Sequence, residues 1–316
     1  MSKIRQIAGL ALLAVGLLLM HAESLISLVN EARSPKDLGA VSSWCYQPDA
    51  VDFKTSNKSG CDVLVIDADD ATRAAYSSKS LASVRMNSDG TRRTVLAYLD
   101  IGEADAHRPY WRHAWQANPP AWIVRQNEAW RGSFKVRYWS PQWQDIIYGG
   151  PDSRLDSIVK SGFDGVYLDN VDAYADLLPE NPEARSQMVA FVASLVREAR
   201  TKRPRFKVIV QGAEELLTDS AFLDVIDGVA KEDLLFGIKG AGVRNQTADI
   251  GHSVKHLQIA RQHGKPVFVM EYLEPTATET ARDEIMREGF VPYFAQHRRC
   301  VECGRDEAIR PPASSP

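Results

Sequence analysis

Residues 162–174 read GFDGVYLDNVDAY, a glycine-bracketed turn followed by a short apolar run that stops at Asp169. A short continuous apolar run bounded by turn signals is typical of a strand buried on both faces. Asp169 then has two interpretations. It can cap the helix that follows, because Asp is a preferred N-cap residue, or the strand can present its carboxylate to an active site. The rest of the chain must decide between them.

Similar apolar runs recur along the whole chain, with helical patterns between them. In residues 186–202 the apolar side chains follow the i, i+3, i+4 spacing of an amphipathic helix. Buried strands that alternate with helices indicate a parallel sheet covered by helices. The expected strands are residues 40–44, 62–67, 94–100, 135–139, 165–169, 207–211, 228–232 and 266–272.

Eight such strands favour a single-domain (β/α)8 TIM barrel over an open doubly wound sheet, which usually has fewer strands. We expect this barrel to cover residues 38–299. A ninth apolar run, residues 290–295, exceeds the count, and we expect it to be an extra segment that lies over the barrel after the last helix. No glycine-rich phosphate-binding motif follows a strand, so nucleotide binding has no support.

The N-terminus carries Lys3 and Arg5 before an uncharged apolar run over residues 7–20, which is the pattern of an export signal. The run is short for a membrane span, which needs about 20 apolar residues. We therefore expect residues 1–22 to be a signal peptide or an uncleaved membrane anchor, with a linker over residues 23–37. The protein would be exported to the periplasm or the outside of the cell, or stay tethered to the membrane.

Four cysteines give an even count in a chain expected to be exported, which favours disulfides and leaves three pairings open. Cys300 and Cys303 have half of a zinc-binding spacing, but no second such pair or paired histidines accompany them, so zinc is the weaker interpretation. Residues 300–316 should form a partly disordered tail. The other two cysteines are Cys45 and Cys61.

The composition is that of a globular protein without a basic face. Hydrophobic residues make up 44% of the chain and charged residues 25%, and the formal net charge is -3. We therefore expect no nucleic-acid partner.

The carboxyl ends of barrel strands surround one shared mouth, which is where the active site of such a barrel lies. Five of the eight expected strand ends are carboxylates. Each alone could cap a helix, but acids gathered at one mouth repel and raise one another's pKa. Acids in that position suit catalysis, and a pair of carboxylates is the equipment of a glycosidase. The eight end residues are Trp44, Asp67, Asp100, Trp139, Asp169, Gln211, Glu232 and Glu271.

Aromatic residues near the strand ends fit a sugar ligand. Trp44 and Trp139 are expected to stack on the apolar face of a sugar ring, whereas Tyr98 and Tyr167 are expected to pack inside the barrel. The acids of DADD (67–70) could instead bind Mg²⁺ or Ca²⁺. No calcium-loop spacing follows them, and no histidine stands at an expected strand end, so we expect neither a metal nor a cofactor.

Several segments together resemble glycoside hydrolase family 114, the endo-α-1,4-polygalactosaminidase group. Each motif is short, but they follow in the family's order and each stands at or near an expected strand end. The similarity runs from residue 44 to about residue 295. The segments are WCYQ (44–47), YLDIGEAD (98–105), RYWSPQW (137–143), GFDGVYLDNVDAY (162–174), QGAEEL (211–216), KEDL (231–234) and MEY (270–272).

The resemblance implies a (β/α)8 barrel that cleaves α-1,4-linked galactosamine polymers within the chain, without a metal. It also implies that the acids ending the fifth and seventh strands, Asp169 and Glu232, form the catalytic pair. We assign Asp169 as the nucleophile or base and Glu232 as the proton donor. Family members often have Asn where this chain has Gln211. The expected substrate-binding residues are Trp44, Tyr46, Asp67, Asp100, Glu103, Trp139, Asp172, Gln211, Glu271 and Tyr272.

A deacetylated galactosamine polymer is cationic, so the acids beyond the catalytic pair would draw the substrate toward the mouth. Asp172 is expected either to contact the substrate or to begin the next helix. Two other functions stay open at this point. One is a non-catalytic carbohydrate-binding barrel, and the other is a metal-dependent hydrolase that uses the acidic strand ends.

Overall fold

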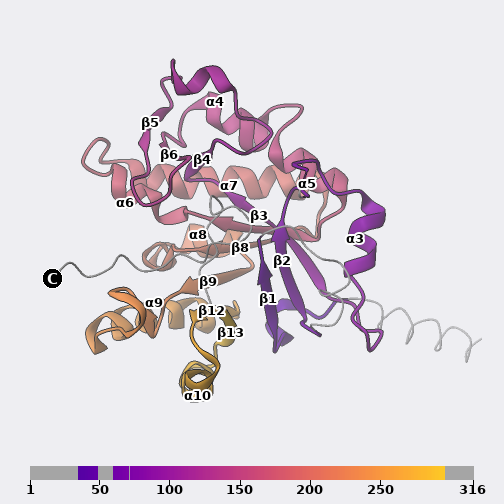
Figure 1. Cartoon of the computed structure of the whole chain (residues 1–316), viewed down its shortest axis with the longest axis vertical. Helices are drawn as coiled ribbons and strands as arrows, with labels where there is room; N and C mark the ends of the chain where they lie inside the picture. Colours follow the sequence, from indigo (N-terminus) through magenta and orange to yellow (C-terminus); the bar gives the residue numbers. More distant parts are fainter. Residues whose placement is uncertain (1–34, 49–59, 71, 296–316) are drawn as a thin grey trace, which may run out of the picture.

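The computed structural model describes residues 35–48, 60–70 and 72–295 (Figure 1). Its centre is an eight-stranded sheet in the order β1-β2-β3-β7-β8-β9-β12-β13, and neighbouring strands run parallel. These strands are β1 (Trp44–Gln47), β2 (Val63–Asp67), β3 (Thr94–Asp100), β7 (Gly165–Asp169), β8 (Lys207–Gln211), β9 (Gly228–Glu232), β12 (Val267–Tyr272) and β13 (Val291–Ala295).

The first and last strands of this sheet meet side by side. The indole Nε1 of Trp44 donates to the carbonyl oxygen of Val291 at 3.0 Å, and the hydroxyl of Tyr293 donates to the carbonyl oxygen of Tyr46 at 3.2 Å. The sheet therefore curls into a nearly closed barrel, and the expected (β/α)8 fold is confirmed.

Two strand assignments made from the sequence are wrong. The run at 135–139 is not a barrel strand, because β3 pairs directly with β7 and β6 (Ser133–Val136) lies in a separate antiparallel sheet. The run at 290–295 does not lie over the barrel. It contains β13, the eighth barrel strand, which pairs along β12. Asp169 and Glu232 consequently end the fourth and sixth barrel strands.

Helices cover the outside of the barrel. In the longest helix, α7, the side chains predicted to face inward are buried, including Met188, Phe191 and Leu195. The helices are α3 (Ser78–Val84), α4 (Pro141–Gln144), α5 (Arg154–Ser161), α6 (Tyr174–Leu177), α7 (Ala184–Lys202), α8 (Ser220–Val225), α9 (Thr247–Gln262) and α10 (Thr278–Arg287). Shorter turns are η1 (Leu38–Ala40), η2 (His113–Gln116), η3 (Asp145–Gly149), η4 (Val171–Ala173), η5 (Glu214–Thr218) and η6 (Pro275–Ala277).

The turn from α5 into β7 shows how the sequence builds a site-bearing strand. Ser153 caps the start of α5 by accepting a hydrogen bond from the backbone N–H of Asp156 at 3.2 Å. Gly162 ends the helix with a φ of 98°, a left-handed conformation that glycine adopts without a steric penalty. The strand that follows is buried as far as Leu168 and ends at Asp169.

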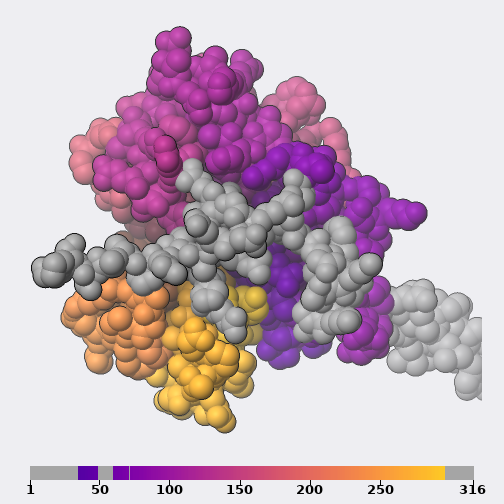
Figure 2. All heavy atoms as spheres, viewed as in Figure 1, coloured from indigo at the N-terminus to yellow at the C-terminus, as the bar shows by residue number. Residues whose placement is uncertain are grey.

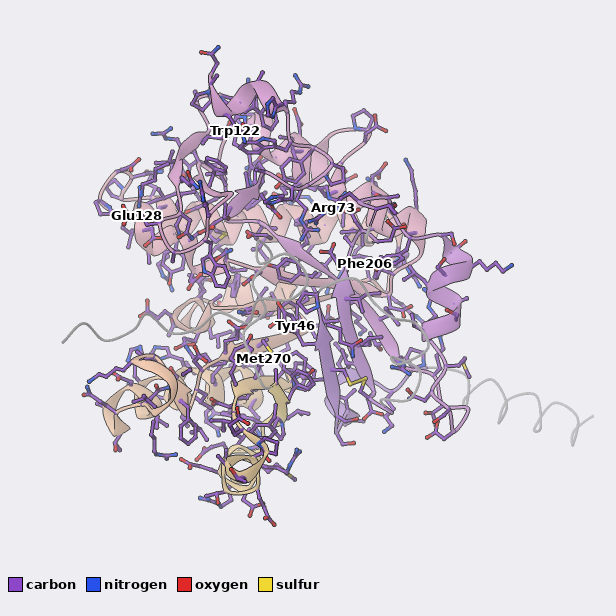
Figure 3. All side chains as sticks on the ribbon, viewed as in Figure 1. Tyr46, Arg73, Trp122, Glu128, Phe206 and Met270 are labelled. Atoms are coloured by element: carbon purple, nitrogen blue, oxygen red, sulfur yellow. A yellow bond between two sulfur atoms is a disulfide. The ribbon has the colours of Figure 1, made fainter. Side chains whose placement is uncertain are left out.

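Bulky side chains fill the barrel interior, as expected for a small closed barrel. Trp44, Tyr167, Phe268 and Met270 belong to this inner cluster, which is separate from the larger cluster between the strands and the helices. In Figure 3, Tyr46 and Met270 lie near the centre of the molecule.

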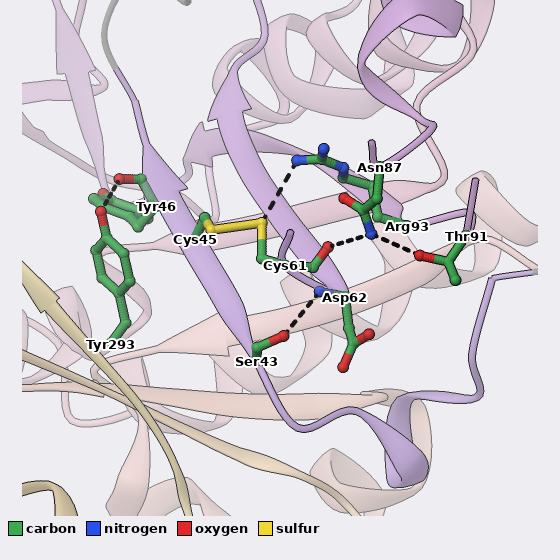
Figure 4. The surroundings of a disulfide bond; sticks show 9 residues. All are labelled: Ser43, Cys45, Tyr46, Cys61, Asp62, Asn87, Thr91, Arg93 and Tyr293. Atoms are coloured by element: carbon green, nitrogen blue, oxygen red, sulfur yellow. Dashed lines mark hydrogen bonds between the residues drawn. A yellow bond between two sulfur atoms is a disulfide. The ribbon is translucent and has the colours of Figure 1, made fainter. Parts of the chain in front are cut away.

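A disulfide joins Cys45 on β1 to Cys61 just before β2, which identifies one pair among the three possible arrangements (Figure 4). Asn87 donates to the carbonyl oxygen of Cys61 at 3.3 Å, and Nη1 of Arg93 lies 3.6 Å from its Sγ. Cys300 and Cys303 lie outside the described residues. So do the expected signal or anchor, the linker up to residue 34, the barrel boundary at 299 and the tail.

The segment between β3 and β7, residues 101–164, carries a small three-stranded sheet above the barrel in Figure 1 and forms part of the upper lobe in Figure 2. Its strands are β4 (Glu103–Asp105), β5 (Ile123–Gln126) and β6. Tryptophans pack behind it, with ring centroids 5.1 Å apart for Trp115 and Trp122 and also for Trp122 and Trp143. A hairpin of β10 (Phe236–Gly237) and β11 (Gly240–Arg244) follows β9.

Among the residues that the structure describes, no helix has both the length and the apolar character needed to cross a membrane.

Candidate active site

Asp169 lies at the mouth of the barrel and is held on both of its carboxylate oxygens. The hydroxyl of Tyr98 donates to Oδ2 at 2.6 Å, and the backbone N–H of Asn170 donates to Oδ1 at 2.8 Å. Asp169 does not cap the next turn, since the N-cap residue of η4 is Asn170 and its side chain makes no capping bond. The strand therefore aims this carboxylate at the mouth.

Glu232 ends β9 and is held by a tyrosine in the same way. The hydroxyl of Tyr272 on the neighbouring strand β12 donates to Oε1 of Glu232 at 2.5 Å. Burial raises the pKa of Tyr46, Tyr167 and Tyr272, and the negative charges of Glu232 and Asp169 raise it further. These phenols stay neutral and can act as hydrogen-bond donors around the two carboxylates.

Asp169 and Glu232 interact electrostatically. Burial, followed by the negative charge of Glu232, raises the pKa of Asp169 to about 7. Hydrogen bonds from Tyr98 and Asn170 act in the opposite direction, because they stabilise the ionised form. The pair therefore keeps one proton up to near-neutral pH, which leaves one acid and one carboxylate at the same mouth.

A cavity of about 230 Å³ opens beside Glu232. Asp172, Gln211 and Asp233 line it, together with Ile238 from the β10–β11 hairpin. Burial raises the pKa of Asp172 to about 6, although the side chain is reached by solvent. Many protein atoms therefore lie near the carboxyl group of Asp172, but a ligand in the cavity can still reach it.

The sequence model of glycoside-hydrolase family GH114 matches residues 27–306. The chain belongs to this family. The resemblance seen in its motifs is thereby confirmed.

Relatives of this GH114 chain occur in distant organisms. An uncharacterised protein of Deinococcus radiodurans is 34% identical over 216 residues, which cover 68% of this chain and 67% of that protein. An uncharacterised protein of Methanocaldococcus jannaschii is 30% identical over 297 residues, which cover 88% of this chain and 81% of that protein.

Two solved structures share the fold of this GH114 barrel. The glycoside hydrolase domain of PelA from Pseudomonas aeruginosa superposes with a TM-score of 0.62 at 20% identity, over 81% of this chain and 95% of that chain. Ega3 from Aspergillus fumigatus, solved in complex with galactosamine, gives a TM-score of 0.59 at 16% identity, over 84% of this chain and 94% of that chain.

Several predicted substrate contacts of the GH114 barrel are occupied by other protein groups. Asp67 accepts from Nη1 of Arg108 at 2.6 Å. Glu103 is buried and lies 2.5 Å from Nζ of Lys135, its partner across β4 and β6, so this ion pair lies within the small sheet. Glu271 is fully buried, and it accepts from the backbone N–H of Leu235 at 2.7 Å. These three acids support the loops around the mouth.

Gln211 and Asp100 also have protein partners at the mouth. The hydroxyl of Tyr167 donates to Oε1 of Gln211, and Gln211 also lines the cavity. Asp100 accepts from the backbone N–H of Glu103 at 2.9 Å and from Nδ2 of Asn170 at 2.7 Å. Tyr46 and Tyr272 lie close to Asp169 and Glu232.

The stacking role expected of Trp44 is wrong. Trp44 begins β1 rather than ending a strand, and its ring packs inside the barrel against Tyr167 and Phe268 with 3% of the residue exposed. The strand ends at Gln47 instead. Trp139 does not end a barrel strand either. It is half-buried and packs edge-on against Tyr138, with the ring centroids 5.0 Å apart.

Two acids of the DADD segment, Asp67 and Asp69, pair with arginines. Asp69 lies 2.7 Å from Nη2 of Arg154, while Arg108 holds Asp67. Within the described ranges, no three or more His, Cys, Asp and Glu side chains are grouped so that they could hold a metal ion.

Sequence reasoning missed Tyr98 and Asn170. The sequence predicts that Tyr98 packs inside the barrel, yet its hydroxyl donates a hydrogen bond to Asp169. The direct pairing of β3 with β7 places Tyr98 opposite Tyr167 and Asp100 opposite Asp169. The alternation of side chains along β3 would have predicted that Tyr98 faces Asp169 if β3 and β7 had been expected to be neighbours. The strand expected at residues 135–139 separated them.

Proposed function

We propose that this protein is an endo-acting glycosidase that cleaves internal α-1,4 bonds of a galactosamine-containing polysaccharide. The observation that carries the proposal is the pair Asp169 and Glu232. A tyrosine fixes each acid, and burial together with the charge of Glu232 raises the pKa of Asp169 to about 7. The galactosamine bound to Ega3 supports the sugar class. A polymeric substrate also fits the export expected from the N-terminal sequence.

In this mechanism Asp169 is the carboxylate that attacks the sugar or activates water. Donors on both of its oxygens stabilise its ionised form, whereas Glu232 receives one bond, from Tyr272. Glu232 is the proton donor to the oxygen of the leaving sugar in this scheme. The neutral tyrosines keep both carboxyl groups oriented during these steps.

Asp172 gives the site its preference for an amino sugar. Its carboxylate faces the cavity beside Glu232 and is open to solvent, so it can pair with the ammonium group of a deacetylated galactosamine unit. Lys231 also lines the cavity, but Glu214 holds its Nζ at 2.9 Å. The carboxylate of Asp172 is therefore available to a cationic ligand.

The test is to incubate the purified protein with α-1,4-linked galactosamine oligomers and N-acetylgalactosamine oligomers, and to identify the products by mass spectrometry. We expect internal cleavage, preserved in a chelator and lost in Asp169→Asn and Glu232→Gln. Asp89→Asn, an exposed change in the turn before β3, is the matched control. Binding without cleavage by the wild type would favour the carbohydrate-binding alternative, and loss of cleavage in the chelator would favour a metal-dependent hydrolase.

A further inference from the structure

We propose that Asp100 and Asn170 work together as positioning residues that orient the carboxylate of Asp169. The proposal rests on the proposed function, because it takes Asp169 to be a catalytic group. Neither residue is required to contact the substrate for this role.

Asn170 holds Asp169 through an unusual backbone conformation. Its φ is 54° and its ψ is 35°, in the left-handed region where Asn is tolerated better than most other non-glycine residues. This turn brings the backbone N–H of Asn170 back onto Oδ1 of Asp169 at 2.8 Å. The direction of the Asp169 carboxylate therefore depends on Asn170 keeping this conformation.

Asp100 fixes Asn170 from the neighbouring strand. Nδ2 of Asn170 donates to Oδ2 of Asp100 at 2.7 Å. The other oxygen of Asp100 accepts from the backbone N–H groups of Gly102 at 3.1 Å and Glu103 at 2.9 Å. Both oxygens of Asp100 are thus engaged, so Asp100 ties Asn170 to the loop after β3.

The backbones of the two loops are also in direct contact. The N–H of Ile101 donates to the carbonyl oxygen of Asp169 at 3.2 Å. A Cβ at Gly102 would overlap the carbonyl oxygen of Asn170 and lie 2.6 Å from Cβ of Ala173, so only glycine permits this approach. The contact keeps Asn170 within hydrogen-bonding distance of Asp100. Asn170 in turn fixes the orientation of the Asp169 carboxylate.

Four variants separate the parts of this arrangement: Asn170→Gly, Asn170→Ala, Asp100→Asn, and the double variant Asp100→Asn with Asn170→Gly. Glycine keeps the left-handed conformation and the N–H but loses the bond to Asp100, so we expect kcat to fall about tenfold with KM nearly unchanged. Alanine resists the left-handed conformation as well, so we expect a loss of about a hundredfold. The double variant should have a kcat no lower than that of the less active single variant, because both changes break the same hydrogen bond between Asn170 and Asp100.

The second readout is a carbon-13 NMR titration of the Asp169 carboxyl group, which needs no substrate. Asn170→Ala keeps the backbone N–H but should turn it away from Oδ1 of Asp169. The pKa of Asp169 should then rise, because that hydrogen bond stabilises the ionised form. Thermal unfolding of each variant checks the fold, and Asn170→Gly and Asp100→Asn report on the link if the alanine variant does not fold. Arg73→Gly, at another left-handed residue with a φ of 65°, is the matched control.

The two readouts distinguish this inference from the proposed function. If the wild type cleaves no galactosamine polymer but the Asp169 titration shifts as expected, the proposed function fails and the positioning role stands. If Asn170→Gly and Asp100→Asn keep wild-type kcat and the Asn170→Ala titration is unchanged, the positioning role is overturned. Additive losses in the double variant would also contradict it.

Discussion

The hydroxyl of Tyr98 on β3 donates a 2.6 Å hydrogen bond to Oδ2 of Asp169 at the end of β7. The two strands are neighbours in the sheet, and Tyr98 stands opposite Tyr167 in their register. One face of β3 thus supplies a phenol to the carboxylate that ends the next barrel strand. The proposed catalytic pair is built across strands, and each acid accepts a hydrogen bond from a tyrosine on a neighbouring strand.

Tyr98→Phe should therefore lower activity without harming the fold. The change removes a hydrogen bond to a charged group, worth about 1.5–3 kcal/mol, so we expect kcat/KM to fall roughly 10- to 100-fold. The pKa of Asp169 should rise further. Steady-state kinetics on a galactosamine oligomer checks the first effect, and Tyr148→Phe, whose hydroxyl donates to Gln144 away from the mouth, is the control. Wild-type kinetics in Tyr98→Phe would refute this role.

Glu232→Gln should lower the pKa of Asp169 while abolishing hydrolysis. The charge of Glu232 is the largest cause after burial that raises the pKa of Asp169 to about 7. Burial remains in the variant, so the pKa should fall without reaching its ordinary value. Asp172→Asn should lower it less, because the charge of Asp172 raises the pKa of Asp169 less than the charge of Glu232 does. Carboxyl NMR titration of the three proteins gives the order, and an unchanged pKa in Glu232→Gln would show that the two acids are not coupled.

The activity should decrease above neutral pH. A two-carboxylate mechanism needs one protonated and one ionised acid, and the pair keeps its single proton until the pH passes about 7. Above that pH both acids ionise and no proton donor remains. We expect kcat/KM to fall along a single titration centred near pH 7, measured with the fold monitored by circular dichroism. A rate that stays level to about pH 9 would exclude this protonation scheme.

Asp172→Asn should remove the preference for deacetylated substrate. If Asp172 pairs with an ammonium group, the variant should show a KM several-fold higher on galactosamine oligomers and nearly unchanged on N-acetylgalactosamine oligomers. Raising the salt from about 50 to about 500 mM should increase the wild-type KM on the cationic oligomer more than that of the variant. Equal salt dependence in the two proteins would argue against an electrostatic role for Asp172.

The fold class and the acids that end strands at the mouth could be predicted because both depend on local patterns. A continuous apolar run that ends in an acid, such as the run ending at Asp169, shows where a buried strand reaches the mouth. The partner of a strand is not a local property. Residues 135–139 and 290–295 are both short apolar runs, and only tertiary packing decides that the second joins β12 while the first joins β4 and β5.

The supporting residues of the site could not be predicted for a related reason. Asn170 acquires its role from a left-handed turn and from the approach of the loop after β3, neither of which its residue type determines. Glu271 and Tyr272 are adjacent on β12 and point to opposite sides, since side chains alternate along a strand. Tyr272 reaches Glu232, whereas Glu271 holds the backbone after β9. The sequence indicated both Glu271 and Tyr272 as candidate site residues but not which of the two side chains faces the mouth.

Glu271 should make the stability of the protein depend on pH. Glu271 is fully buried, and burial raises its pKa from 4.5 to about 7. Between these values the folded state binds more protons than the unfolded state, so the free energy of unfolding decreases as the pH rises. The contribution is fully present below about pH 4.5 and is lost as the pH rises through about 7, and it amounts to about 3 kcal/mol at most.

Glu271→Gln cannot ionise and should remove this part of the slope. We expect the variant and the wild type to have similar stability near pH 4.5, and the variant to be more stable by up to about 3 kcal/mol near pH 8. Urea unfolding across this range measures the difference, and Glu198→Gln on the outer surface of α7 is the matched control, which should follow the wild type. Parallel curves for wild type and Glu271→Gln would mean that Glu271 is ionised throughout, held by the backbone N–H groups of Leu235 and Phe236.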